Sequence, residues 1–301
     1  MGKCLHINDN IIDREIKIPV GIKVVKIRCI YLDKGFKLKG DVKELYISCI
    51  DIYDNLEFED SLDKLYIDCD YNINKEIKLP VGVKVVKIKC ESMDKGFKLI
   101  GGVNELYISC TDIYDNLEFE DSLDELYIEC EGINKEIKLP VGVKIVRINC
   151  GFMDKGFKLI GGVNKLYISC TYIYDNLEFE DSLDELNIEC DYYYTINREI
   201  KLPVGVKIVR INCGIMDKDF KLIGVVNELH ISCSELNNDL EFEDGLEILG
   251  IYCESHIYKQ INLPLSLKKL IVNEYYMNKY SKELIESWLP FGCVLCICEV
   301  Y

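Results

Sequence analysis

Apolar and polar residues alternate along this chain in short runs that recur at a fixed interval. One unit reads EIKLPVGVKVVKIKC from Glu76 to Cys90, the next reads GFKLIGGVNELYISC from Gly96 to Cys110, and a third reads NLEFEDSLDELYIEC from Asn116 to Cys130. Each unit holds two stretches of strict alternation, separated by turn residues such as Gly and Pro. A period of two is typical of a half-buried strand, so every unit is predicted to contain two short strands.

Cysteine marks the interval between these units. Twelve of the 16 cysteines end the second alternating stretch of successive units. They are Cys29, Cys49, Cys69, Cys90, Cys110, Cys130, Cys150, Cys170, Cys190, Cys213, Cys233 and Cys253. The spacing is 20 residues, except for 21 before Cys90 and 23 before Cys213. The three unit types follow one another in order, which adds a longer repeat of about 60 residues. A fixed period of this length indicates a repeat architecture.

These repeats predict a mostly β chain that folds as a single right-handed solenoid of about 14 coils. The main strands are expected to form one parallel sheet, with a second short strand in each coil. The count includes a weakened unit at Leu5–Asp9 and a last one that ends at Glu274. We expect a partial repeat or cap at residues 1–14, the repeat solenoid at 15–274 and a C-terminal cap at 275–301.

The segment Leu79-Pro80-x-Gly82-Val83-x-x-Val86-x-Ile88 resembles the core of FNIP-type repeats, and the run from Leu263 to Val272 is closer still. These repeats belong to the leucine-rich-repeat class and abound in amoebae and giant DNA viruses. The likeness extends over nearly the whole chain as a period, although the Leu-Pro signature stands only in every third unit. The resemblance implies leucine-rich-repeat-like coils and a non-enzymatic interaction scaffold.

The period stops after Glu274, where a cap should cover the open end of the solenoid. Residues 281–289 read as a short helix with Ser281 as its N-cap and with Pro290 ending it. Trp288, Leu284 and Ile285 are expected to cover the last coil. The run from Phe291 to Tyr301 then reads as a final apolar strand.

The cysteines are interpreted as buried free thiols, because the Cys at the end of each main strand is expected to point inward. Disulfides between neighbouring coils and bound metal are the alternatives. Cys293, Cys296 and Cys298 form a C-x-x-C-x-C run, but no second pair or nearby His completes a zinc site. The first residues show no secretory signal. A reducing, cytoplasmic location is therefore expected, with the virion as the alternative.

Charge and hydropathy exclude two classes of partner. The chain has 36 basic and 52 acidic residues, for a net charge of −16. Nucleic-acid binding depends on Lys and Arg that neutralise phosphates, so no nucleic-acid partner is expected. No apolar run approaches the roughly 20 residues that a spanning helix needs, so no membrane insertion is expected.

The residues one and three places before each Cys should face outward from the main sheet. The first unit type places basic pairs there, such as Lys26 with Arg28 and Lys87 with Lys89. The second and third types place Tyr with Ser or with an acidic residue. The candidate partner-binding residues on this face are Tyr46, Tyr66, Tyr107, Tyr127, Tyr167, Arg147, Arg210 and His230. The pattern allows either a protein-binding surface or a lattice of cross-strand pairs that serves only the sheet.

Departures from the repeat cluster late in the chain. Asn187, His230 and Gly250 replace the expected Tyr. The longest gap between cysteines holds an insertion that contains Tyr192, Tyr193 and Tyr194. Insertions in repeat proteins often lie on a binding face, so these three residues are added to the candidate partner-binding site.

Enzymatic chemistry is not expected, and neither catalytic residues nor a cofactor are assigned. The chain has three His, and no nucleophile-elbow or phosphate-loop motif occurs. Acidic runs such as Glu118-x-Glu120-Asp121 recur three coils apart, which is too far for the copies to share a calcium ion. Lys at the same offset in the intervening units predicts a solvated ion-pair lattice instead.

Two functional hypotheses follow from these observations. The first is a scaffold that binds a protein partner through the exposed face of its parallel sheet, favoured by the late departures. The second is a structural component of a giant-virus particle or surface layer, with self-assembly, favoured by the near-identity of the repeats. A carbohydrate-binding face of stacked Tyr is a more distant third hypothesis.

Overall fold

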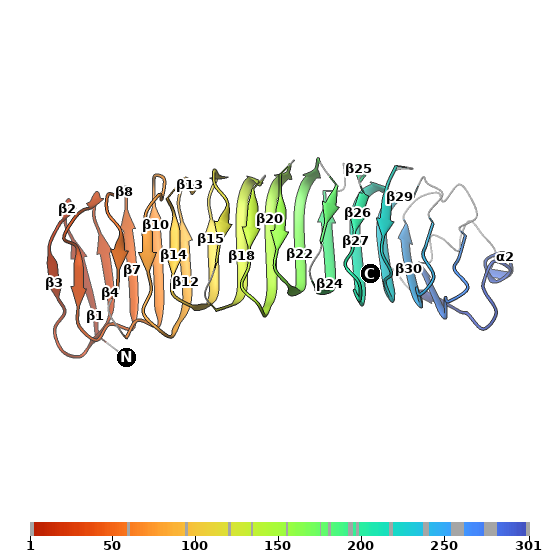
Figure 1. The fold of residues 1–301 in the computed structure, drawn as a ribbon, viewed down its shortest axis with the longest axis horizontal. Coiled ribbons are helices and arrows are strands. Elements are labelled where there is room, and N and C mark those ends of the chain that lie inside the picture. Colours follow the sequence, from red (N-terminus) through yellow and green to blue (C-terminus); the bar gives the residue numbers. More distant parts are fainter. Residues whose placement is uncertain are drawn as a thin grey trace. The chain divides into compact units, whose positions relative to one another are not determined.

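A computed structural model of the chain is mostly β. It describes residues 3–58, 61–93, 96–119, 122–133, 135–154, 156–174, 176–179, 182–191, 195–196, 199–216, 219–236, 241–253, 262–273 and 282–298. The chain divides into two compact units, each with contacts mainly within itself. Unit 1 is Met1–Cys150 with Leu159–Gly162, and unit 2 is Gly151–Lys158 with Val163–Tyr301. Within each unit, coils of about 20 residues stack as a parallel β-solenoid, which confirms the predicted fold class (Figure 1).

The main sheet of each unit is built from the strands that the alternation predicted. In unit 1 they are β1 (Lys3–Asn8), β4 (Ile22–Arg28), β7 (Glu44–Cys49), β10 (Lys64–Cys69), β12 (Val83–Lys89), β15 (Val103–Ser109) and β18 (Leu123–Ile133). In unit 2 they are β22 (Val163–Ile173), β24 (Leu183–Cys190), β27 (Ile208–Met216), β29 (Glu228–Leu236), β30 (Ile248–Cys253), β31 (Lys269–Asn273) and β32 (Val294–Cys298). One further main strand, β20 (Val143–Met153), holds residues of both units.

The second short strand of the coil is present as expected. Its copies in unit 1 are β3 (Glu15–Lys17), β6 (Lys37–Lys39), β9 (Leu56–Glu57), β11 (Glu76–Lys78), β14 (Lys98–Ile100), β17 (Leu117–Glu118) and β19 (Glu136–Lys138). Those in unit 2 are β23 (Leu177–Glu178), β26 (Glu199–Lys201) and β28 (Lys221–Ile223), and β21 (Lys158–Ile160) holds residues of both units. These strands also pair in parallel from one coil to the next within each unit.

A third short strand follows the cysteine, where the sequence predicted only a linker. Its separate copies are β2 (Ile11–Ile12), β5 (Tyr31–Leu32), β8 (Asp51–Ile52), β13 (Ser92–Met93), β16 (Asp112–Ile113) and β25 (Thr195–Ile196). In β18, β20, β22, β27 and β29 the main strand continues through this position. The reason is a third inward column at the third residue after Cys, where Leu32, Ile52 and Met93 are buried.

The core is made of side chains that stack on the same offset of the neighbouring coil. Leu45 pairs with Leu65 in register, and Leu65 pairs with Val86 on the next strand. All three are fully buried. Burial of each such side chain is worth about 1.5–3 kcal/mol, and a coil gains it only from its neighbours. Stability therefore comes from the interfaces between coils.

The twelve periodic cysteines are buried, and all 16 cysteines of the chain carry free thiols in the structure. Cysteines of adjacent coils lie side by side: the two Sγ atoms are 3.8 Å apart in Cys170 and Cys190, and 3.2 Å apart in Cys233 and Cys253. Burial raises the pKa of Cys130 to about 12, and it also raises the pKa of Cys213. Because the thiolate is the reactive form, these two thiols should be chemically inert in the folded protein, and burial restricts the access of a reagent to the other ten.

We therefore expect only a few thiols to react with a disulfide reagent in the native protein at mildly alkaline pH. Cys4 is exposed, and Cys293, Cys296 and Cys298 are half-buried, which makes four candidates for reaction. In denaturant all 16 should react. A time course of thiol release in native and denatured protein measures both numbers. A denatured count below about twelve would show that some of the buried column had been oxidised, because only four cysteines lie outside it.

The C-terminal helix ends earlier than the predicted residue 289. Helix α2 spans Lys282–Glu286 and the chain then turns, with the Trp288 N–H donating to the carbonyl of Ile285. Ile285 is buried and Trp288 half-buried, but Leu284 is 44% exposed, so the expectation that Leu284 covers the last coil is wrong. In so short a helix, one inward position at Ile285 leaves its neighbour Leu284 facing outward. The predicted N-cap Ser281 lies outside the described residues.

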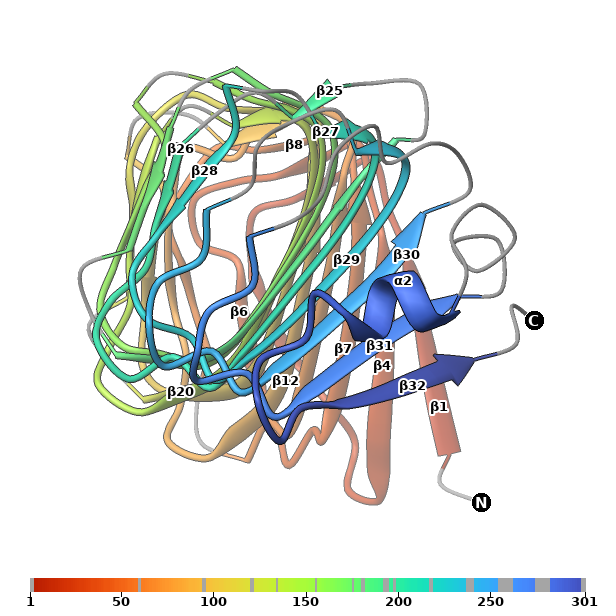
Figure 2. The same cartoon turned by 90° about the vertical axis from the view of Figure 1, so that its right-hand side faces the viewer.

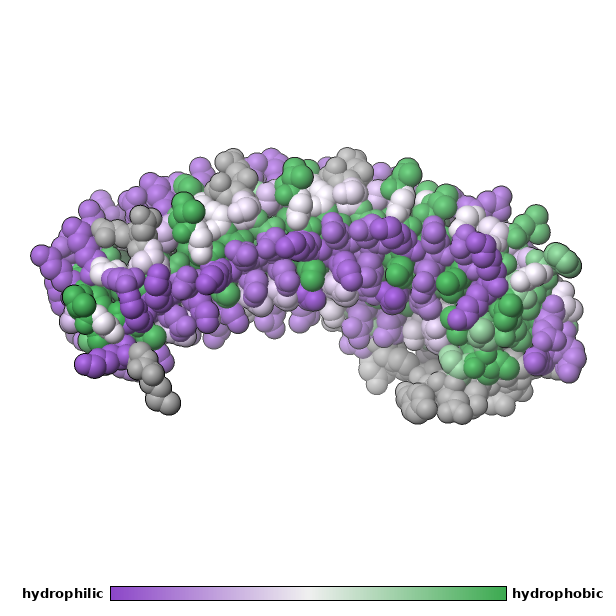
Figure 3. Space-filling view, turned by 90° about the horizontal axis from the view of Figure 1, so that it is seen from below, coloured by the Kyte–Doolittle hydropathy of each residue, from purple (hydrophilic) through white to green (hydrophobic). Residues whose placement is uncertain are grey.

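The final strand β32 pairs in parallel with β31 and so extends the main sheet of unit 2 by one strand (Figure 2). Ile297 stands in register with the buried Val272 but is itself 46% exposed, and Val294 is 58% exposed. Hydrophobic surface gathers at the end of the molecule that carries β32 (Figure 3). The last strand thus continues the stacked apolar positions of the core, but its own apolar side chains remain partly exposed to solvent.

Candidate functional site

The outward face of the main sheet in unit 1 carries two rows of side chains. The outer row lies three residues before Cys and runs His6, Lys26, Tyr46, Tyr66, Lys87, Tyr107 and Tyr127, one residue per strand from β1 to β18. The second row lies one residue before Cys and runs Asn8, Arg28, Ser48, Asp68, Lys89, Ser109 and Glu129. Strict register between coils places each side chain beside its equivalents.

The tyrosines of the outer row stack in pairs. The ring centroids of Tyr46 and Tyr66 are 4.5 Å apart with an interplanar angle of 2°. Those of Tyr107 and Tyr127 are 4.3 Å apart at 9°. This spacing is close to the distance of about 4.8 Å between neighbouring strands, so the sheet itself sets the stacking. The rings are half-buried.

The hydroxyl groups of Tyr46, Tyr107 and Tyr127 donate to glutamates on their own strands. Tyr46 Oη donates to Glu44 Oε2 and Tyr107 Oη to Glu105 Oε2, each at 3.1 Å. Burial, together with the hydrogen bond to Glu44 and its charge, raises the pKa of Tyr46 to about 12. The sequence interpretation did not include these glutamates, although Glu stands two places before Tyr in several units. The hydroxyls are therefore held as donors within the sheet.

The cations of the outer row lie over the tyrosine rings. Lys26 Nζ is 5.1 Å from the ring centroid of Tyr46, and Lys87 Nζ is 4.3 Å from that of Tyr107. Such cation–π contacts are worth about 0.5–1 kcal/mol where the cation stays exposed. The predicted lattice of cross-strand pairs therefore exists, and it consists of aromatic and cationic groups.

Arg147 of the following strand β20 is held more tightly. Its Nη1 donates to Tyr127 Oη at 2.7 Å and lies 3.7 Å from Glu125 Oε2. Its guanidinium carbon is 4.9 Å from the Tyr127 ring centroid. The guanidinium of this predicted site residue is thus held by a tyrosine hydroxyl, with a carboxylate nearby.

A groove of about 700 Å³ lies on this face of unit 1, over strands β1 to β15. Of the predicted site residues, Tyr46, Tyr66 and Tyr107 line it. Tyr127 and Arg147 lie beyond it on the same face. The groove is also lined by side chains that the predicted site left out: His6, Lys26, Arg28, Lys87 and Lys89. The signal for the lysines and arginine was present in the basic pairs of the first unit type.

In unit 2 the predicted face residues make internal contacts. Arg210 forms an ion pair with Glu185. His230 lies between two partners, with Nε2 2.6 Å from Glu228 Oε1 and Nδ1 3.0 Å from Tyr252 Oη. A Cβ at Gly250 would collide with the His230 ring, so the loss of the expected Tyr there allows this contact. Tyr167 is half-buried on β22. The predicted residues Tyr192, Tyr193 and Tyr194 lie outside the described residues.

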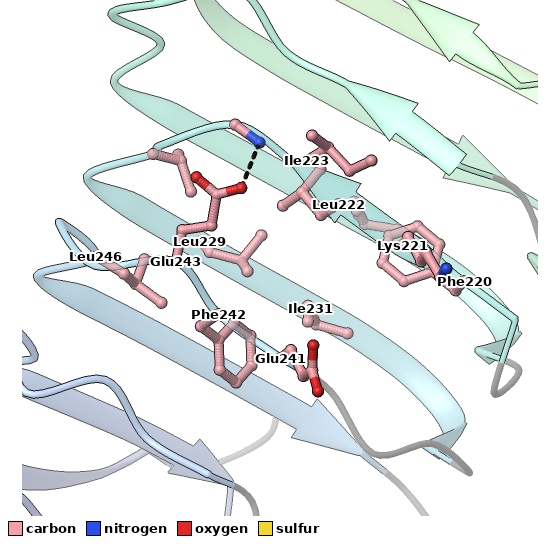
Figure 4. A pocket seen from close by; sticks show the side chains of 13 residues that line it. Phe220, Lys221, Leu222, Ile223, Leu229, Ile231, Glu241, Phe242, Glu243 and Leu246 are labelled. Atoms are coloured by element: carbon pink, nitrogen blue, oxygen red, sulfur yellow. Dashed lines mark hydrogen bonds between the residues drawn. The ribbon is translucent and has the colours of Figure 1, made fainter.

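A second cavity, of about 550 Å³, lies in unit 2 between β28 and the coil that follows it (Figure 4). It is lined by core residues such as Phe220, Leu229 and Ile231, and the Gly224 N–H donates to Glu243 Oε1 at its rim. Phe242 is half-buried here, whereas Phe119 and Phe179 at the same offset are buried. The cavity is thus lined mostly by side chains of the core.

Ion pairs between adjacent coils occupy the face of the second strands. Lys138 lies 3.5 Å from Glu118, and Lys201 lies 3.5 Å from Glu178, which confirms the predicted ion-pair lattice at these positions. Within the described ranges, no three His, Cys, Asp or Glu side chains gather as a metal site would require. No described helix is long and apolar enough to cross a membrane.

Comparisons with known proteins add no relative. No protein-family model, no curated protein and no solved structure matches the chain.

Proposed function

We propose that this protein is a non-enzymatic scaffold, similar to FNIP-type leucine-rich repeats, that binds a protein partner through the exposed face of its main parallel sheet. The groove on unit 1 carries this proposal. It combines tyrosine rings and Arg28, residue types that are enriched at the binding hot spots of protein interfaces, with three Lys side chains. Its volume is within the range of pre-formed binding sites.

The geometry of the face favours recognition of a partner. The tyrosine rings are already stacked, so a partner that contacts them loses little of their conformational entropy. The register between coils holds the rows in place, because a slip of one residue would turn the buried column outward. A rigid surface with ordered aromatic groups is suited to a specific partner.

A bulky neutral residue in the groove should block the partner whatever its charge. We expect Ser48→Trp to weaken capture of the partner from the native source by at least about tenfold, because the indole would fill the space beside Tyr46 and Tyr66. Val81→Trp is the matched control, since Val81 lies exposed at a turn and outside the groove. Quantitative pull-down with both variants measures the effect. Equal capture by the two variants would contradict a binding site in the groove.

A structural role with self-assembly, as in a giant-virus particle or surface layer, is the second candidate function. The uncovered apolar residues of β32 favour it, because an exposed edge strand is a template for pairing with another chain. Sedimentation over a range of protein concentrations separates the two functions. Growth into open-ended assemblies would support the structural role, and a monomer would argue against it.

A further inference from the structure

The groove of unit 1 is positively charged in a chain whose net charge is −16. Four cations line it, namely Lys26, Arg28, Lys87 and Lys89, against the single carboxylate of Asp68. Several other lysines of unit 1 have carboxylate partners, among them Lys43 with Asp41, Lys64 with Glu44, Lys84 with Asp63 and Lys144 with Asp124. What distinguishes the groove is that four cations line one hollow with a single carboxylate among them.

Three of the four cations have no carboxylate at ion-pair distance among the described residues. Lys26 and Lys87 lie over tyrosine rings, and Arg28 is exposed at the end of β4. Lys89 lies 3.7 Å from Asp68, but the side chains are 71% and 55% exposed, so this pair is weak. A hollow surface with unneutralised charge of one sign attracts ligands of the opposite sign.

The cations form two pairs with the stacked rings between them. Lys26 and Arg28 stand on β4, and Lys87 and Lys89 stand on β12. Strands β7 and β10 separate the pairs and carry the stacked Tyr46 and Tyr66. Three strand spacings amount to about 14 Å. An extended peptide covers this distance in about four residues.

We propose that the groove binds an acidic peptide segment of the partner, laid in extended conformation across β4, β7, β10 and β12. Carboxylates four residues apart contact the two cation pairs, and the apolar side chain midway between them packs on Tyr46 and Tyr66. The inference rests on the proposed protein-binding function of this face and adds the chemistry of the partner.

A short acidic segment suits the groove better than a long polyanion. Beyond β15 the second row continues with Glu129 on β18, and a polyanion that extended past the groove would meet this charge. The lining cations number only four, far fewer than the phosphates that even a short oligonucleotide brings. The tyrosine rings also offer an apolar side chain a contact between the two charges.

The strands from β12 to β20 repeat the unit types found from β4 to β12, but they do not repeat the charge arrangement of the groove. From β12 to β20, Glu129 and Asn149 stand where Asp68 and Lys89 stand in the groove. Arg147, which is equivalent to Lys87, is paired with Glu125 and Tyr127. Arg147 is therefore a matched control for Lys87, because it stands in the same row and already has a carboxylate partner.

The test uses the whole chain and a labelled peptide, Gly-Ser-Glu-Ala-Leu-Ala-Glu-Ser-Gly, with fluorescence anisotropy as the readout. We expect saturable binding that weakens with added salt, and no binding of the peptides in which Gln or Lys replaces both Glu. Lys87→Gln should weaken binding by about tenfold, because it removes an unpaired cation that contacts the ligand. Arg147→Gln should change it less than about twofold, because Glu125 already holds that charge.

Other outcomes would overturn the inference. One is a failure to bind the Glu peptide, and another is equal weakening by Lys87→Gln and Arg147→Gln. A third is tighter binding of a single-stranded oligonucleotide than of the Glu peptide, which would identify a phosphate site. Circular dichroism of each variant checks that the sheet is intact. If Ser48→Trp still blocks capture of the native partner, the protein-binding function stands even where the acidic-peptide proposal fails.

Discussion

Replacing Leu106 by Ala should lower the free energy of unfolding by about 3–4 kcal/mol. Leu106 is 0% exposed, and it pairs in register with Val86 on one side and Leu126 on the other. Shortening the side chain leaves a cavity that touches two interfaces between coils. In a solenoid these interfaces supply most of the stability, so the loss is felt on both sides.

Leu5 provides the matched control, because it occupies the same offset in the first strand. It is half-buried and pairs in register with Val25 alone among the described residues. We expect Leu5→Ala to cost about 1 kcal/mol, since less apolar area is removed from one interface only. Urea denaturation followed by far-ultraviolet circular dichroism measures both values. Equal losses at the two sites would show that coil interfaces do not dominate stability.

Gly101→Ala should cost about 2–3 kcal/mol. Gly101 has φ +105°, and a Cβ there would lie 2.7 Å from the carbonyl oxygen of Leu79 in the preceding coil. The Leu79 N–H donates to the carbonyl of Ile100 at 2.8 Å, so the two coils are held together at this point. The added methyl group must push them apart or distort the turn.

Gly82→Ala separates the cost of the clash from the cost of the backbone conformation. Gly82 has φ +88°, but nothing lies within 4 Å of an added Cβ. Only the unfavourable left-handed conformation remains, which is worth about 1–2 kcal/mol for an L-residue. Urea midpoints of the two variants should therefore differ, with Gly101→Ala the lower. If the two midpoints coincide, close contact between coils is not what requires glycine at Gly101.

The alternation and the cysteine interval predicted the coil well. The main strands, including the weakened ones at β1 and β31, lie where the pattern placed them, and so do the second short strands. The third strand was missed because a two-residue run such as Tyr31–Leu32 has no alternation to recognise. Its signal was the recurrence of an apolar residue three places after Cys, as in Leu32, Ile52 and Met93.

The candidate site was predicted only in part. The rule that residues one and three places before Cys face outward correctly placed Tyr46, Tyr66 and Tyr107 on the sheet face. The sequence did not distinguish the unpaired Lys87 from its counterpart Arg147, because both occupy the same offset in the repeat. Their difference lies in Glu125, which reaches Arg147 from the adjacent strand β18.

The sequence by itself determined the parallel solenoid, the register of its coils and the identity of the outward residues. Periodicity suffices for these, because a side chain with a fixed offset can reach the core in only one register. Only the tertiary structure decided which cations are neutralised, which rings stack and where the groove lies. These depend on distances of a few ångströms between side chains from different coils. Such distances are set by packing across the sheet, and the repeat pattern along the chain does not contain them.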